Sequence, residues 1–463
     1  MQKVLFFISQ DLYAKHYLTF ESFKQIEEKY ECSYLATENV KFFKEIIAQK
    51  KNFLGFLNEN KKRNILSRIF TDALLLANRH KSSSFPFRVI MRFNLNFRNV
   101  IRKPLWKIPF RILIRLFYSF RILSVRLPLA LIVKNKFMLK KINNLIHKNE
   151  NLKKIIQKLK PDLIIMPNSG ADTFFFQLIV ESKKRDIDIM TFAIIDNWDN
   201  LSTKSVIPER PSFIGVWGEQ SKKHAIEIQN FKSEQCKVIG SARYQKYFDL
   251  RNKNLKSHFD FDYILFLGTS WNWNEEEVLE TLDNIISRNN VLNKKYKIIY
   301  RPHPFRQGKT IPKKFKNIIY DPEILNILEN KTHRYSDLNY YPSLIKNAKL
   351  IIGGPQTMMI ESTIFNKFYL ALTHDDKINY GNMKKVFETY EHFRGIKNIE
   401  TIHYCDDLNK IEKKIIEIIS LEPLDINIVD NQRNYVLFND EQKYDQRILN
   451  IVDEILKKKI VKD

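Results

Sequence analysis

The sequence contains little cysteine: three thiols, at Cys32, Cys236 and Cys405, in 463 residues. They lie far apart and form no Cys-x-x-Cys pair, which argues against a zinc site of the usual cysteine-rich pattern. A sparse and odd number of cysteines is also typical of proteins from a reducing compartment. We therefore expect three reduced, buried thiols.

Long apolar runs are lacking as well. Near the start, the apolar run from Val4 to Ile8 is too short for the hydrophobic region of a signal peptide, and no small-residue cleavage site follows it. No stretch approaches the roughly 20 apolar residues that are needed to span a bilayer. These observations predict a cytoplasmic protein.

Acidic residues are absent from one long stretch, between Asp72 and Glu150, in a chain whose formal net charge is +25. Large apolar residues alternate with basic residues there. The basic residues include Arg79, Lys81, Arg88, Arg92, Arg98, Arg102, Lys103, Lys107, Arg111, Arg115, Arg121 and Arg126. The apolar residues include Phe85, Phe87, Phe93, Phe97, Trp106, Phe110, Phe117, Tyr118 and Phe120.

This basic stretch suits an anionic lipid surface, where each cation near the headgroups contributes about 1 kcal/mol. Nucleic acid attracts the same charges, but no recognisable nucleic-acid module is present. A solvated helical hairpin with a basic face is the remaining alternative. We expect an insert over about residues 60–150 that holds a peripheral protein at the inner face of the cytoplasmic membrane and binds no nucleic acid.

The rest of the chain alternates short apolar runs with helical segments, and its length suits two domains of roughly 200 residues each. Continuous apolar runs are typical of strands buried on both faces of a parallel sheet. The expected strands are 3–9, 33–36, 162–167, 189–195, 213–217 and 237–240, then 263–268, 297–300, 317–320, 349–353 and 368–372. Helices are expected at 18–30 and 275–287, among other places.

A polar segment, 249–260, separates the two sets of strands. The pattern predicts an α/β protein with two Rossmann-like, doubly wound domains that face an interdomain cleft, over residues 1–250 and 251–463. The last helix is an element that could return to the first domain. Ligands of such sheets bind beyond the carboxyl ends of the strands, so the functional residues should follow these runs.

Two motifs of the second half follow expected strands. In Arg301-Pro302-His303-Pro304 the prolines fix the backbone on both sides of the histidine. Arg301 offers a planar fork and His303 a hydrogen bond to a phosphate group, whereas the alternative is a structural turn.

The second motif is Gly353-Gly354-Pro355-Gln356-Thr357, which precedes a helical segment. Glycines permit close backbone approach, and a helix start offers unpaired N–H groups to an anion. Glu361 could accept hydrogen bonds from ribose hydroxyls. Without a P-loop lysine this is not an ATP-type site. Gly268 and Thr269 form a weaker candidate of the same kind.

Acidic side chains follow the strands of the first half. A transferase that inverts configuration needs one base to take a proton from the acceptor hydroxyl. Asp172 is the favoured base, with Asp196 and Asp11 as competitors on position alone. For Asp196-Asn197-Trp198-Asp199-Asn200, an Asx-rich loop around a packed tryptophan is an equally good interpretation.

The order PDLII, DNWDNLSTK, RPSFIGVWGEQSKKHAI, KVIGSARYQ, ILFLGTS, YRPHP and GPQTMMIESTIFNK resembles a bacterial superfamily of GT-B transferases that build surface polysaccharides. It includes CDP-glycerol glycerophosphotransferase-like proteins, capsule and lipopolysaccharide 3-deoxy-manno-octulosonate transferases, and bacterial sialyltransferases. The resemblance covers roughly Leu152 to Leu372. It implies that His303-Pro304 is the family's His-Pro motif and that Gln356-Thr357 stands at its Ser/Thr motif. Here the pair is Gln-Thr, and no acidic-acidic-glycine motif for the base is present.

The resemblance implies an inverting, metal-independent glycosyltransferase with a nucleotide-sugar donor, best a CMP-linked ulosonic acid. The acceptor would be a cell-surface polysaccharide or a lipid-linked glycan, and no cofactor would be bound permanently. The two Asp-x-Asp sequences, at residues 186–188 and 260–262, each precede an expected strand rather than follow one, so neither is expected to be a manganese site. The alternatives are a CDP-glycerol- or CDP-ribitol-type polyol-phosphate transferase, a UDP- or GDP-sugar transferase, a nucleotide-sugar epimerase and a non-catalytic relative of the same fold.

Overall fold

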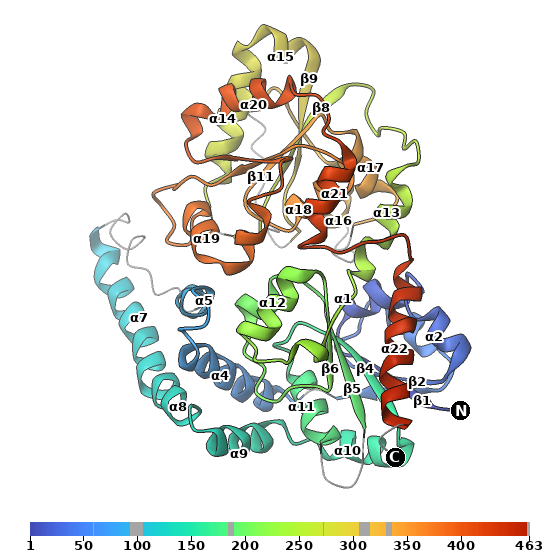
Figure 1. The fold of residues 1–463 in the computed structure, drawn as a ribbon. Helices are drawn as coiled ribbons and strands as arrows, with labels where there is room; N and C mark the ends of the chain where they lie inside the picture. Colours follow the sequence, from blue (N-terminus) through green and yellow to red (C-terminus); the bar gives the residue numbers. More distant parts are fainter. Residues whose placement is uncertain are drawn as a thin grey trace. The chain divides into compact units, whose positions relative to one another are not determined.

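The computed structural model describes residues 1–58, 60–92, 105–183, 189–271, 273–304, 315–329 and 336–460. The chain folds as two units (Figure 1). Unit 1 is formed by the described residues of Met1–Leu95, Pro109–Gln245 and Asn434–Asp463, and unit 2 by those of Asn96–Ile108 and Lys246–Arg433. The chain thus passes into unit 2 after Gln245 and returns to unit 1 at Asn434.

Unit 1 contains a seven-stranded sheet in the order β3-β2-β1-β4-β5-β6-β7, and all of its described pairs are parallel. The order reverses between β1 and β4, which is the switch point of a doubly wound sheet. The strands are β1 (Lys3–Ile8), β2 (Glu31–Thr37), β3 (Phe53–Leu57), β4 (Leu163–Asn168), β5 (Met190–Ile195), β6 (Phe213–Val216) and β7 (Cys236–Val238).

Both faces of this sheet are covered, because alternate residues of its strands enter different cores. On β1, Leu5 and Phe7 join one cluster with α10 (Glu150–Leu159) and α11 (Thr173–Ser182). Val4 and Phe6 join another cluster, to which α2 (Lys24–Lys29) and α22 (Tyr444–Ile460) contribute. Burial on both faces explains why the strands are continuous apolar runs rather than alternating ones.

The remaining elements of unit 1 are short connections and the helices of the insert. The connections are α1 (Asp11–Tyr13), the π-helix η1 (Ala14–Leu18), α3 (Lys44–Ala48), η4 (Asn200–Lys204), α12 (Glu219–Glu227), η5 (Ser233–Gln235) and η6 (Ala242–Tyr244). The insert comprises α4 (Lys61–Ala77), α5 (Ser84–Arg92), α7 (Ile108–Arg121), η3 (Ile122–Arg126), α8 (Leu127–Ile132) and α9 (Lys136–His147), together with η2 (Leu105–Lys107), which is assigned to unit 2.

Some side chains of the insert pack inside it and so are not available to contact a lipid surface. Phe85 of α5 is fully buried and belongs to a cluster with Phe70 of α4, and Phe87 is 3% exposed. Asp72 of α4 forms ion pairs with Arg92 and with Arg126, whose Nε lies 2.8 Å from its carboxylate. Phe85, Phe87, Arg92 and Arg126, which we assigned to a lipid-facing pattern, are therefore internal contacts of the insert. Phe93, Phe97, Arg98, Arg102 and Lys103 lie outside the described residues.

Unit 2 has a six-stranded parallel sheet in the order β10-β9-β8-β11-β12-β13, with its own switch point between β8 and β11. The strands are β8 (Asp262–Leu267), β9 (Tyr296–Arg301), β10 (Ile318–Tyr320), β11 (Leu350–Gly353), β12 (Tyr369–Leu372) and β13 (Ile402–Cys405). The two parallel, doubly wound sheets confirm the expected α/β fold class.

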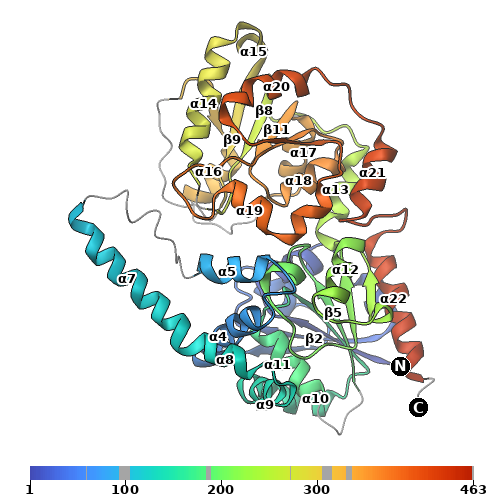
Figure 2. The ribbon, with the colours of Figure 1, turned by 60° about the vertical axis from the view of Figure 1, so that its left-hand side comes forward.

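Helices α14 and α20 pack their apolar sides against this sheet: Leu282 and Ile415 share a core with Ile264 and Phe266 of β8 (Figure 2). The helices assigned to unit 2 are α13 (Gln245–Arg251), which begins at the last residue of unit 1, α14 (Glu275–Arg288), α15 (Asn290–Lys295), α16 (Pro322–Glu329), α17 (Tyr340–Asn347), α18 (Met358–Ile364), α19 (Met383–Thr389), η7 (Glu391–Ile396), η8 (Leu408–Lys410), α20 (Ile411–Ile419) and α21 (Ile426–Asn434).

The helix expected over 18–30 differs in the structure. The π-helix η1 ends at Leu18, turns follow, and α2 begins only at Lys24. Glu21, with φ of 50°, adopts a left-handed conformation that a right-handed helix cannot accommodate. Two edge strands, β3 and β13, escaped prediction. In the described part of the chain, no individual helix has both the length and the apolar character to cross a bilayer.

Candidate functional site

The first group of predicted residues lies at the carboxyl edge of the sheet in unit 2. β8 pairs with both β9 and β11, so the loops that follow these three strands are neighbours. Gly268 follows β8, and a Cβ atom built there would lie 3.0 Å from the backbone nitrogen of His303 and 3.0 Å from Cα of Pro302. The glycine therefore lets the two loops approach more closely than a side chain would allow.

The glycine loop after β11 joins the same place. A Cβ atom on Gly354 would lie 2.8 Å from Cγ2 of Thr269, so these two loops are also in close contact. Tyr369 of β12 donates a hydrogen bond of 2.9 Å to the carbonyl oxygen of Gly354 and accepts one of 3.0 Å from Gln356. Gln356 also donates to the carbonyl oxygen of Leu267 at 3.3 Å. Its amide thus ties the glycine loop to the strand ends.

Glu275, which the sequence analysis did not single out, organises the loop after β8. One of its carboxylate oxygens accepts hydrogen bonds from the backbone nitrogen of Thr269 at 2.9 Å and from the indole of Trp273 at 2.7 Å. The other oxygen accepts from the hydroxyl of Tyr300 at 2.6 Å. The carboxylate is buried, and it fixes the loop beside His303. An acidic residue at the start of a helix is common, so nothing in the sequence marked it.

Arg301 is placed differently from the free phosphate-binding fork that we expected. Its guanidinium forms ion pairs with Asp321, which follows the neighbouring strand β10, and with Glu323 at 2.6 Å. It also donates to the hydroxyl of Ser336 at 2.8 Å and lies over the ring of Tyr341. Burial alone would lower the pKa of Arg301, but the two carboxylates more than offset this and raise it. In this structure Arg301 holds the strand ends together.

His303 and Pro304 remain partly exposed at the end of β9, as a ligand-contacting pair must be. Thr357 immediately precedes α18. Glu361, in contrast, is fully buried within α18, so this structure does not present its carboxylate to a ribose as we expected.

His374, just beyond β12, is a second residue that sequence reasoning missed. It is 5% exposed, its ring packs on Trp273 with centroids 5.6 Å apart, and burial lowers its pKa. Neither ring nitrogen has a hydrogen-bond partner among the described residues.

In unit 1, Asp172 lies at the switch point of the sheet, between the ends of β1 and β4. It caps α11 by accepting a hydrogen bond of 3.0 Å from the backbone nitrogen of Phe174. Ser9 and Gln10, which follow β1, donate to its other oxygen, Gln10 at 3.3 Å. Burial raises the pKa of Asp172, and these hydrogen bonds act in the opposite direction. A raised pKa makes a carboxylate a better proton acceptor near neutral pH.

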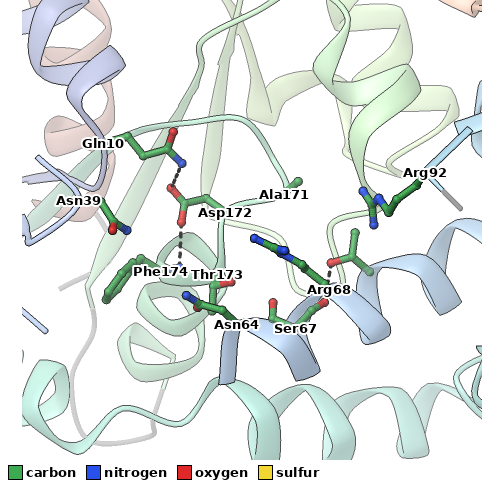
Figure 3. Close-up of a pocket in the computed structure, with 11 residues that line it drawn as sticks. Gln10, Asn39, Asn64, Ser67, Arg68, Arg92, Ala171, Asp172, Thr173 and Phe174 are labelled. Carbon is green, nitrogen blue, oxygen red and sulfur yellow. Dashed lines mark hydrogen bonds between the residues drawn. The ribbon is translucent and has the colours of Figure 1, made fainter. Parts of the chain in front are cut away.

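Asp172 forms part of the wall of a cavity of about 190 Å³ (Figure 3). Helix α4 of the insert supplies the opposite wall with Asn64, Ser67, Arg68 and Thr71, whose spacing places them on one side of the helix. The guanidinium of Arg68 points toward the loop that carries Asp172 (Figure 3). Within the described residues, Arg68 is paired with no carboxylate. Neither Asn64 nor Arg68 was a candidate, because no motif marks them.

Asp11 has a structural position. One oxygen of its carboxylate accepts hydrogen bonds from the backbone nitrogens of three successive residues, Lys41 at 2.8 Å, Phe42 at 2.8 Å and Phe43 at 3.3 Å. This arrangement holds the loop after β2 against the helical turn after β1. It leaves Asp11 the least suited of the three acidic candidates to accept another proton.

Asp196, at the end of β5, pairs with His16 of η1, whose Nδ1 lies 2.9 Å from its carboxylate. Both side chains are about 6% exposed. Burial lowers the pKa of His16 more than Asp196 raises it, and Arg243 and Lys15 lower it further. In the same loop Trp198 is buried, and Lys204 lies 3.5 Å from Asp199. Asp172 is the only one of the three candidates that lines the described cavity.

Across the described part of the chain, no three His, Cys, Asp or Glu side chains gather as a metal site would require.

Comparison with known proteins gives a likeness of fold only. No family model matches the chain, and no curated relative matches it. A UDP-GlcNAc 2-epimerase from Methanocaldococcus jannaschii has a similar structure, with 12% identity, a TM-score of 0.50, and coverage of 98% of this chain and 100% of the other. The lipopolysaccharide outer core galactosyltransferase WaaB has 9% identity and a TM-score of 0.46, with coverage of 98% of this chain and 99% of the other. The wall teichoic acid polymerase TagF has 13% identity and a TM-score of 0.40, with coverage of 71% of this chain and 96% of the other. The first of these likenesses agrees with the GT-B fold class.

Proposed function

We propose that this chain is a glycosyltransferase that moves a sugar from a nucleotide-activated donor, best a CMP-linked ulosonic acid, to a cell-surface polysaccharide or a lipid-linked glycan. The observation that carries the proposal is the edge of the sheet in unit 2. There Gly268 and Gly354 bring three loops together beside His303, which is partly exposed. Loops of this kind bind the phosphates of a nucleotide at the switch point of a doubly wound sheet.

The proposed reaction is a single displacement with inversion and without a metal. Asp172 takes the proton of the acceptor hydroxyl, and the oxygen of that hydroxyl attacks the anomeric carbon of the donor. The bond between this carbon and the phosphate oxygen breaks, and the nucleotide leaves with the electron pair. His303 donates a hydrogen bond to the phosphate as charge develops on it, with Thr357 and the glycine loops beside it. Arg301 does not contact the donor in this mechanism; it positions His303 by holding the end of β9.

The cavity beside Asp172 supports an acceptor site in unit 1. Its wall carries amides from Gln10, Asn39 and Asn64, which suit the hydroxyl groups of a sugar, and the guanidinium of Arg68, which suits an anionic group. The acceptor is therefore proposed to be a glycan that carries a negative charge. Raised by burial, the pKa of Asp172 favours the role of base.

A nucleotide panel tests the proposal. CMP, CDP, UDP, GDP and ADP are each added to the purified protein, and its thermal unfolding is followed. A ligand present at 100 times its dissociation constant stabilises the fold by about 2.7 kcal/mol. We expect CMP or CDP to raise the unfolding temperature and the effect to be lost in His303→Ala. Selective stabilisation by UDP or GDP would be consistent with a transferase but would show that the donor is not CMP-linked. No response to any nucleotide would overturn the proposal.

An epimerase is the second candidate, because the structure with a TM-score of 0.50 bears that description. An epimerase converts its nucleotide sugar without any acceptor. Incubation of the protein with UDP-GlcNAc alone, followed by chromatography of the sugar, separates the two: conversion to a second nucleotide sugar would favour the epimerase. A polyol-phosphate transferase differs again, since it transfers phosphorus from a CDP-alditol to the acceptor.

A further inference from the structure

Helices α7, η3 and α8 form one continuous helix, Ile108–Ile132, whose outward side is apolar. No side chain of α7 is buried. The side chains most exposed along it recur with helical spacing, and they are Phe110 at 67%, Leu113 at 64%, Leu116 at 55%, Phe117 at 58%, Phe120 at 66%, Leu123 at 58% and Leu131 at 68%. Isolated exposed apolar residues are ordinary, but a contiguous stripe of this length marks an interaction surface.

The opposite side of the same helix is polar or attached to the insert. Arg111, Arg115 and Ser119 are partly exposed, and one or two turns later Ile122 and Arg126 are buried. The spacing of these residues by three or four positions places them on one side of the helix, opposite Phe110, Phe117 and Phe120. The helix is therefore amphipathic with its apolar side outward, the reverse of a helix that covers a protein core. Figures 1 and 2 both show α7 extending outward from α8, away from the sheet of unit 1.

The charges on this helix have one sign. Lys107, Arg111, Arg115 and Arg121 are accompanied by no acidic residue, since none occurs between Asp72 and Glu150. Burial is the first reason that the pKa of Arg115 is lowered, and the neighbouring Arg111 is the second. A second copy of this chain seated symmetrically on the helix would bring arginines against arginines, because a two-fold interface pairs a surface with itself. An anionic partner relieves this repulsion.

We propose that residues 106–132 form a docking segment whose helix lies in the plane of an anionic lipid surface, with Phe110, Phe117 and Phe120 among the acyl chains. Arg121, whose guanidinium lies over the ring of Phe117, flanks the apolar stripe, where phosphate headgroups would contact it, whereas Arg111 and Arg115 lie on the other side of the helix and add to the attraction at longer range. Trp106, which precedes α7, is 76% exposed, and tryptophan is a residue type enriched at membrane–water interfaces. The inference concerns this helix alone and is independent of the nucleotide that unit 2 binds.

The test uses the full chain and vesicles of phosphatidylcholine, with or without 30% phosphatidylglycerol. We expect flotation with the anionic vesicles only, and release when the salt concentration rises from 0.05 to 0.5 M. The triple variant Phe110→Ser/Phe117→Ser/Phe120→Ser should have a vesicle–water partition coefficient at least tenfold lower than the parent. It should fold normally because the three rings are exposed. Val291→Ser, at a position 75% exposed in unit 2, is the matched control and should float like the parent.

Trp106 provides an independent readout of the same helix. Of the other four tryptophans, Trp198, Trp217 and Trp273 are no more than 4% exposed and Trp271 is partly exposed, so the part of the fluorescence change that Trp106→Phe removes reports on this helix. We expect the tryptophan emission to shift to shorter wavelength and to be protected from quenching by iodide, and we expect both effects to be lost in Trp106→Phe. Equal binding of the triple variant and the parent would overturn the proposal. So would binding to double-stranded DNA but not to vesicles, or a dimer in sedimentation that the triple variant abolishes.

Discussion

Nδ1 of His16 lies 2.9 Å from the carboxylate of Asp196, so a buried imidazole joins the π-helix after β1 to the end of β5. Burial lowers the pKa of His16, which favours a neutral ring whose Nδ1 donates to the carboxylate. A hydrogen bond to a charged group contributes about 1.5–3 kcal/mol, and a buried carboxylate without its donor is destabilising.

His16→Ala should therefore lower the free energy of unfolding by about 2 kcal/mol or more. His80→Ala is the control, because His80 is exposed, and it should change stability by less than about 0.5 kcal/mol. Urea unfolding monitored by circular dichroism measures both. Equal midpoints for the two variants would show that the His16–Asp196 pair does not stabilise unit 1.

Asp172→Asn should abolish transfer while keeping the fold. Asparagine is as good a helix cap as aspartate, and its amide oxygen can still accept from Phe174. Removal of a general base lowers the rate by about 10²–10⁴-fold. The expected result is a folded protein with a somewhat lower unfolding temperature, because the amide nitrogen of asparagine cannot accept from Ser9 and Gln10, together with normal nucleotide binding and a loss of kcat of this size.

Asp11→Asn and Asp196→Asn are matched controls for that experiment. Asp11→Asn should lower stability, because three backbone nitrogens lose a charged acceptor, and it should leave the rate within about tenfold. If Asp196→Asn instead reproduced the loss of kcat and Asp172→Asn did not, the base would be Asp196.

Arg301 and His303 should separate stability from binding, although they are two residues apart. Truncating one partner of a buried ion pair costs about 3–5 kcal/mol, so Arg301→Gln should unfold at a markedly lower temperature. His303→Ala should unfold close to the parent without nucleotide and lose the stabilisation that nucleotide gives. Calorimetry with and without CMP measures both effects. A stable Arg301→Gln variant with weakened CMP binding would return Arg301 to the role of phosphate ligand.

The strands were predictable because burial on both faces of a sheet leaves a continuous apolar run, as in β4 and β8. Edge strands β3 and β13 are less buried: β13 has the interrupted sequence IHYC, whereas β3 is a short apolar run, FLGFL, that the sequence analysis did not assign. Topology then brought Gly268, His303 and Gly354 together, because parallel strands end at one edge. The partners of Arg301 and Asp172 could not be predicted: Asp321 reaches Arg301 only through the pairing of β9 with β10, and Arg68 faces Asp172 through packing of the insert.

Arg68→Gln should raise the KM for an anionic acceptor by about tenfold, the equivalent of roughly 1.4 kcal/mol, and leave the KM for the nucleotide sugar unchanged. The side chain is exposed on α4 and has no paired carboxylate in the described residues, so its removal should not disturb the fold. Lys62→Gln, on the same helix but away from the cavity, is the control. Steady-state kinetics with an acidic and a neutral acceptor check the charge dependence, and an equal effect on both acceptors would contradict it.

His147 should make the stability of unit 1 depend on pH. The ring is fully buried between Ser67, whose hydroxyl lies 3.0 Å from Nε2, and Asn143, whose carbonyl lies 3.1 Å from Nδ1. Burial lowers the pKa of His147 to about 4 from 6.5. Above pH 6.5 the ring is neutral in both the folded and the unfolded chain, so its titration changes nothing there. Between pH 6.5 and 4 the unfolded chain binds a proton that the folded chain excludes. The free energy of unfolding therefore decreases as the pH is lowered through this interval.

The expected loss over that interval is about 3 kcal/mol, at 1.36 kcal/mol for each pH unit. Urea unfolding at pH 7, 6, 5 and 4 measures it, and His147→Gln removes this titration, so the variant should lose less stability between pH 7 and 4. His80→Gln, at an exposed position, should keep the dependence of the parent. Parallel stability curves for the parent and His147→Gln would mean that His147 takes up a proton equally well in the folded chain, which a ring enclosed by Ser67, Asn143 and Phe176 should not do.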